Sequence, residues 1–205
     1  MKKGLLLIGI TAVIVAGYFL FFAGDDEAQP EAPKQQPLAQ SKNSETFNKP
    51  FNDVLNSYFE LKDALVDWDT AKATAAATKL IDFAGKVPMN ELKADSTIVQ
   101  TAESFNGSVV AEAKGLVGET SIAEKRRAFY TLSENLYNLL RTVRYDQQII
   151  YHDMCPMAFG DNDPAYWLSN SKEIVNPYLG NKHPKYHSGM LGCGSIEDSV
   201  SYVSK

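Results

Sequence analysis

The sequence predicts an all-α fold: an up-down antiparallel four-helix bundle, preceded by a transmembrane anchor and carrying a loop-rich C-terminal metal-site segment. Three observations lead to this prediction. Apolar side chains recur at helical spacing over residues 50–150. An uncharged apolar run occupies residues 4–24. Both cysteines and all three histidines lie after position 150, so any chemistry is expected near the C-terminus.

The apolar run at residues 4–24 is long enough to cross a membrane. At about 1.5 Å per helical residue it extends over roughly 30 Å, the thickness of a bilayer hydrocarbon core. Two lysines precede it and three acidic residues follow it, so the positive-inside rule places the domain in the periplasm. The run exceeds the apolar length of a cleavable signal peptide, so residues 1–24 are predicted to be a retained anchor. The alternative is that signal peptidase removes this segment, and the rest of the chain is exported in that case as well.

Residues 25–49 are predicted to form a flexible tether between the anchor and the folded domain. They contain three prolines among small and polar residues, with few large apolar side chains. Such a composition does not build a hydrophobic core. The folded domain is therefore expected to comprise residues 50–205, with residues 151–205 as its Cys/Met/His-rich segment.

Four stretches with helical periodicity follow the tether. Pro50 is predicted to occupy the first position of the first helix, where the missing N–H of proline is tolerated. Gly118 is expected to end the third helix, and Ser121 with Glu124 three residues later forms a capping-box signal for the fourth. The fourth apolar stripe is expected to continue to Ile150. The apolar positions of the four stretches are Phe51, Val54, Tyr58, Leu61, Leu65 and Trp68; Ala73, Ala76, Leu80, Ala84 and Val87; Ile98, Ala102, Phe105, Val109, Ala113 and Leu116; and Phe129, Leu132, Leu136, Leu139 and Val143.

Charge and motifs exclude several classes of protein. The formal net charge is -5 and no segment concentrates lysine and arginine along its length, so nucleic acid is not an expected partner. The charged helical residues, Lys125, Arg126 and Arg127 among them, are interpreted as solvated faces. No cofactor fingerprint, paired-carboxylate motif or nucleophile–base pair is found, so the chain is not expected to be an enzyme. The sequence also lacks a C-x-x-C motif, which disfavours a thiol oxidoreductase.

The segment at residues 151–205 concentrates soft metal ligands. It is rich in proline and glycine, which predicts loops with short strands or hairpins. Thiolate and thioether sulfur favour copper(I), and imidazole suits copper and zinc. Copper(I) is therefore the expected ion, silver or zinc are further fits, and calcium and magnesium are disfavoured because they require oxygen ligands. The candidate metal ligands are Cys155, Met157, Met190, Cys193, Met154 and His152.

A second interpretation of the same residues remains open. In an oxidising compartment, Cys155 and Cys193 are also suited to a structural disulfide. Methionines fill hydrophobic cores more often than they bind metals, and His183 and His187 are expected more readily as surface residues than as ligands. The domain would then be a disulfide-stapled interaction module that docks on an envelope or efflux assembly without a metal of its own.

Four short motifs occur in order in this segment: CPMA at 155–158, YWLS at 166–169, IVNPYxG at 174–180 and MLGCG at 190–194. They resemble the domain-of-unknown-function family 3347, which occurs as stand-alone exported bacterial proteins and at the C-terminal end of heavy-metal efflux adaptor proteins. The resemblance extends over roughly residues 50–200. It implies copper or silver handling outside the cytoplasm, with a heavy-metal efflux complex as a partner and Cys155, Met157, Met190 and Cys193 as ligands. Residues 181–189, with His183 and His187, form an insertion relative to the family, so these histidines inherit no role from it.

Overall fold

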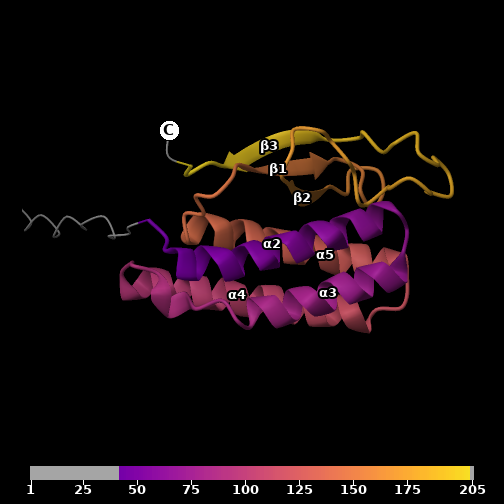
Figure 1. Ribbon diagram of the computed structural model, residues 1–205. Helices are drawn as coiled ribbons and strands as arrows, with labels where there is room; N and C mark the ends of the chain where they lie inside the picture. Colours follow the sequence, from indigo (N-terminus) through magenta and orange to yellow (C-terminus); the bar gives the residue numbers. More distant parts are fainter. Residues whose placement is uncertain (1–41, 204–205) are drawn as a thin grey trace, which may run out of the picture. The chain divides into compact units, whose positions relative to one another are not determined.

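Four long helices follow one another in the computed structural model, which describes residues 42–203. They are α2 (Glu45–Val66), α3 (Thr70–Ala84), α4 (Ser96–Gly118) and α5 (Ile122–Thr142), with a short 3-10 helix, Met89–Glu91, between α3 and α4. Each helix packs against the next one along the chain (Figure 1). The four predicted helical stretches are therefore confirmed, and together they form a helical bundle. All the described helices belong to the unit Leu38–Lys205.

Tyr58 contacts both the helices and the C-terminal segment within the core. Its ring stacks on Phe129 of α5, with ring centroids 5.2 Å apart. Its hydroxyl forms a 2.7 Å hydrogen bond with Ser133 and accepts one of 2.9 Å from the backbone N–H of Leu168. Burial raises the pKa of this phenol well above its usual value, so Tyr58 stays a neutral hydrogen-bonding group in the core.

The first helix begins earlier than the sequence predicted. Ser44 caps α2 by accepting a hydrogen bond from the N–H of Phe47, so Pro50 lies inside the helix and not at its first position. Phe47 is fully buried and stacks on Phe51 at 5.3 Å. This packing holds the first turns in place although Pro50 removes one backbone hydrogen bond. The end of the predicted tether is therefore helical. The rest of the tether, up to residue 41, and the predicted anchor lie outside the described residues.

The last helix, in contrast, ends earlier than predicted. Ser121 does cap α5 through the N–H of Glu124, which confirms the capping box. However, α5 stops at Thr142, and Arg144 adopts a positive φ of 49° as the chain leaves the helix. Ile150 does not extend the helical stripe but begins a β-strand.

The C-terminal segment folds as a three-stranded antiparallel sheet, so the prediction of an all-α fold is wrong for this part of the chain. The strands are β1 (Ile150–Cys155), β2 (Ala165–Ser169) and β3 (Ser195–Val200), in the order β2-β1-β3. Cys155 pairs with Ala165, and Ile150 pairs with Val200. Figure 1 shows the sheet on the α2 and α5 side of the bundle. Long loops before and after β2 complete the segment.

None of the helices within residues 42–203 has the length and apolar character needed to cross a membrane. The predicted anchor at residues 4–24 is not among these helices, so it stays a prediction.

Candidate metal centre

Cys155 and Cys193 meet where β1 ends and β3 is about to begin. Cys155 is the last residue of β1, and Cys193 lies two residues before Ser195, which pairs with Met154. Their sulfur atoms are 3.7 Å apart, and both residues carry free thiols. Cys155 is fully buried whereas Cys193 is partly exposed. The thiol pair is therefore accessible to solvent from the Cys193 side.

Asn176, from the IVNPYxG motif, fixes the loop that carries Cys193. Its side chain is fully buried and donates a 2.7 Å hydrogen bond to the carbonyl of Cys193. Its amide oxygen accepts hydrogen bonds from the N–H groups of Tyr178 and Leu179, at 2.8 and 3.1 Å. Its backbone N–H donates to the carbonyl of Leu191 at 2.8 Å. One side chain thus connects the 174–180 motif to the 190–194 motif, which explains why both are needed to position the thiol.

Gly194 allows the chain to pass close to β1 directly after Cys193. Its φ is 146°, a backbone conformation that residues other than glycine rarely adopt. A Cβ atom here would lie 2.7 Å from the carbonyl oxygen of Met154 and 2.9 Å from the ring of Trp167. The glycine therefore lets the second cysteine approach the first.

Burial also affects the protonation of the Cys193 thiol. Desolvation, followed by the hydrogen bond with Cys155, raises the pKa of the Cys193 thiol to about 11. At neutral pH this group is a thiol, and a metal ion binds it only by displacing the proton. Sulfur donors of this kind favour soft ions over hard ones.

The methionines predicted as ligands have different positions. Met190 shares a tight turn with Cys193, whose N–H donates to its carbonyl at 3.0 Å. Met157 follows Cys155 by two residues in the turn after β1, is partly buried, and also lines a cavity beside α5. Met154 precedes Cys155 on the strand, so its side chain points to the opposite face of the sheet. Met190 and Met157 thus lie in the two turns that carry the cysteines, whereas Met154 does not share the face of Cys155.

His152 is not brought to the thiols. It lies three residues before Cys155 on β1, which puts its side chain on the other face of the sheet. Its Nε2 forms a 2.8 Å hydrogen bond with a carboxylate oxygen of Glu134 on α5. Its ring stacks between those of Tyr137 and Tyr166, with centroid distances of 4.0 and 4.9 Å. In this structure His152 fastens the sheet to the bundle.

The two remaining histidines belong to the 181–189 loop. His183 and His187 exchange backbone hydrogen bonds of 3.3 and 2.8 Å. The His183 ring packs against Trp68 and Tyr186. Among residues 42–203, no three or more His, Cys, Asp or Glu side chains gather as a metal-binding group. A metal at the thiol pair would therefore depend on methionine sulfur for any further protein ligand.

Two cationic side chains have a role that the sequence interpretation missed. Lys125 and Arg126, interpreted as part of a solvated face, are both buried. The Lys125 ammonium donates to the carbonyl of Leu116 at the end of α4. The Arg126 guanidinium donates to the carbonyls of Leu65 and Pro177, at 2.8 and 2.7 Å. Both residues follow the three- and four-residue spacing of the apolar stripe of α5, and this spacing was the available signal of their burial.

Comparison with known proteins gives one match. Residues 54–148 match the family described as Protein of unknown function (DUF3347). The matched part runs from within α2 to the residues just before β1, so it covers the helices and stops before the cysteine motifs. No curated protein and no solved structure matches the chain.

Proposed function

We propose that this chain, a member of the DUF3347 family, binds a soft metal ion, copper(I) above all, through the thiolates of Cys155 and Cys193. The observation that carries the proposal is the 3.7 Å separation of two free thiols. With metal–sulfur bonds of about 2.3 Å, two sulfurs on one ion are roughly 3.8 Å apart in a tetrahedral site and roughly 4.0 Å apart in a trigonal one. The pair therefore fits one ion with little movement.

The chemistry of the neighbouring side chains favours copper(I) over harder ions. Met190 lies in the Cys193 turn and Met157 in the turn after Cys155, and thioether sulfur is a soft ligand. Silver shares this preference, whereas zinc would need further nitrogen, oxygen or thiolate ligands to complete four-coordination. A site of two thiolates and one or two thioethers is the arrangement proposed here.

The proposed role is to hold or pass on the metal and not to catalyse a reaction. The partial exposure of Cys193 supports this role, because an ion held at such a position is accessible for exchange with a partner protein. A periplasmic location behind the predicted anchor, and a heavy-metal efflux complex as the partner, belong to the same proposal and rest on the sequence alone.

Competition for copper(I) tests the proposal. Reduced full-length protein is titrated into a coloured copper(I)–chelator complex, and removal of one equivalent of metal is expected. Cys155→Ser and Cys193→Ser should each abolish this removal, because each deletes one of the two thiolates. Met190→Leu and Met157→Leu delete one soft donor at similar volume, so each should weaken binding without unfolding the domain.

Met89 provides a matched control. It is a buried methionine in the short helix Met89–Glu91, between α3 and α4 along the chain, and lies outside the C-terminal segment. Met89→Leu should leave copper(I) binding unchanged. Wild-type protein that takes no copper(I) from the chelator, or a Cys155→Ser variant that takes as much as wild type, contradicts the proposal.

The same proximity of the thiols supports one alternative function. A disulfide requires the sulfur atoms to be about 2.0 Å apart, so oxidation would need a movement of each side chain but no refolding. In that case the domain is a disulfide-stapled interaction module without a metal. Thiol counting on protein isolated without reductant separates the two functions: two reactive thiols support the metal site, and none supports the module.

A further inference from the structure

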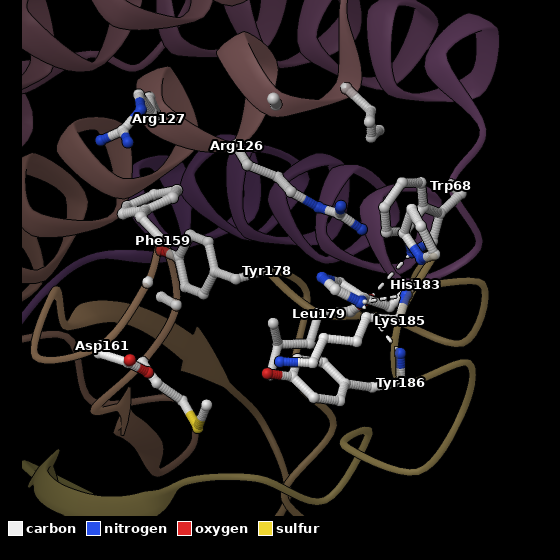
Figure 2. A pocket seen from close by; sticks show the side chains of 16 residues that line it. Trp68, Arg126, Arg127, Phe159, Asp161, Tyr178, Leu179, His183, Lys185 and Tyr186 are labelled. Atoms are coloured by element: carbon white, nitrogen blue, oxygen red, sulfur yellow. Dashed lines mark hydrogen bonds between the residues drawn. The ribbon is translucent and has the colours of Figure 1, made fainter.

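A cavity of about 530 Å³ lies beside the proposed metal site, between the helices and the C-terminal loops. Its walls come from Trp68 just after α2, the first turns of α5, the loop after β1 and the stretch 178–186. The size is within the range of small-molecule sites in proteins. Figure 2 shows the Arg126 side chain extending from α5 towards Trp68 and the turn at 183–186.

Arg126 is the unusual feature of this cavity. Only 3% of its surface is exposed, and no carboxylate pairs with it among the ion pairs of the described chain. Two of its N–H groups donate to the carbonyls of Leu65 and Pro177, although a guanidinium has five N–H groups to offer. Burial lowers its pKa to about 10, so the side chain remains cationic at neutral pH. A buried cation without an anion is costly, and a bound anion would relieve that cost.

The surroundings of Arg126 offset its charge only in part. Leu65 is in the last turn of α2, where the helix dipole presents partial negative charge. The Trp68 ring faces the guanidinium, with its centroid 4.0 Å away. Trp68 itself adopts a positive φ of 59°, which is rare for a bulky residue. The chain therefore holds an aromatic ring in a strained conformation against a buried cation at the cavity wall.

The remaining lining is aromatic and basic. Phe159, Tyr178 and Tyr186 contribute rings, Arg127 and Lys185 contribute further positive charge, and Asp161 is the acidic residue of the lining. His183 accepts hydrogen bonds at Nδ1 from two backbone N–H groups, and burial followed by Arg126 lowers its pKa, so it adds no positive charge. The cavity thus has apolar walls and an excess of cations.

We propose that this cavity binds a small organic carboxylate, with the carboxylate on Arg126 and an aromatic or branched apolar body against the surrounding rings. The planar fork of an arginine matches a carboxylate in a two-point hydrogen bond. A phosphate is less suited, because the N-terminus of α5, the nearest cluster of backbone N–H groups, is already capped by Ser121 and carries Glu124 in its first turn.

Ligand-observed NMR titration of the full-length protein tests this site. The probes are 3-phenylpropanoate, indole-3-acetate and 4-methylpentanoate, each compared with the corresponding neutral amide. At least one acid should bind, and its amide should bind about tenfold more weakly, the loss expected for a charge-assisted hydrogen bond. Phenyl phosphate, which carries a ring and a tetrahedral anion, should bind more weakly than the best acid.

Two variants locate the site. Arg126→Gln should abolish binding of the acids. Because Arg126 also bonds the carbonyls of two separate segments, its substitution could disturb the fold, and a second variant is needed. Lys185 is exposed, and Lys185→Gln should weaken binding of the acids about threefold through loss of a screened charge. Lys172→Gln, an exposed lysine outside the cavity lining, should change nothing.

The outcomes separate this site from the metal site. Cys155→Ser should bind the acids as wild type does, so failure of copper binding and failure of carboxylate binding are independent results. The proposal is overturned if no acid binds at about 5 mM, if the amides bind as well as the acids, or if phenyl phosphate binds best. It is also overturned if Lys185→Gln and a folded Arg126→Gln both bind the acids as wild type does.

Discussion

At the scale of single residues, Asn176 is the side chain on which the thiol geometry most depends. Asn176→Ala would leave the buried N–H groups of Tyr178 and Leu179 without their side-chain acceptor and the carbonyl of Cys193 without its donor. The free energy of unfolding should fall by about 2–4 kcal/mol in a urea titration. Asn135→Ala, at a partly exposed helical asparagine whose side chain bonds only the solvent-exposed carbonyl of Thr131, should change it by less than about 0.5 kcal/mol. Equal losses for the two variants would show that Asn176 does not organise the loop.

The protonation of Cys193 gives a second prediction at this scale. Its pKa is raised to about 11, so copper(I) displaces a proton from it at every pH below that value. The apparent affinity should therefore rise with pH by about a factor of ten per unit for each proton displaced. Chelator competition between about pH 6 and pH 8 measures this slope, with the chelator's own protonation corrected. A flat profile would mean that Cys193 does not bind as a thiolate.

Sequence reasoning at this scale succeeded where chemistry was local and failed where it depended on distant elements. The cysteines were singled out together because both stood among soft donors, and the structure does bring them together. His152 was chosen for the same reason, yet its partner is Glu134 on α5, a carboxylate that the spacing along the chain does not reveal. Arg126 was taken as solvated because the carbonyls that bind it come from α2 and from a loop far along the chain.

At the scale of elements, the positions of the helices were predictable and the positions of the strands were not. The helices show clear apolar stripes because one face of each packs on its neighbours. The central strand β1 has buried residues on both faces, so buried and partly buried residues do not alternate along it. The edge strand β3 exposes five of its six residues. Neither strand therefore shows the period of two that identifies a half-buried strand.

Substitution of Gly194 tests whether the close approach of the chain to β1 just before β3 stabilises the fold. Gly194→Ala forces a side chain into a conformation with φ of 146° and against the carbonyl of Met154. The free energy of unfolding should fall by about 2–4 kcal/mol from backbone strain and overpacking. Gly192→Ala is the matched control, since a Cβ atom there meets nothing within 4 Å, and it should stay within about 1 kcal/mol of wild type. Thermal or urea unfolding of both variants compares them directly.

At the scale of the whole molecule, the helical bundle is the scaffold that holds the C-terminal segment. Leu136 is fully buried in α5 within the core that includes residues of the sheet. Leu136→Ala should lower the free energy of unfolding by about 2–5 kcal/mol through the cavity that it leaves. Glu103→Ala, at an exposed position of α4, should change it by less than about 0.5 kcal/mol. A loss below that limit for Leu136→Ala would contradict the core described here.

The most direct test of the central claim is X-ray absorption spectroscopy of the full-length protein loaded with one equivalent of copper(I). The first shell should consist of about three or four sulfur atoms at about 2.3 Å, because two thiolates and one or two thioethers are the proposed ligands. Cys193→Ser should lose this shell, and Met89→Leu should retain it. A first shell of nitrogen or oxygen atoms, or a sulfur shell that survives Cys193→Ser unchanged, would contradict the assignment of Cys155 and Cys193 as the metal-binding pair.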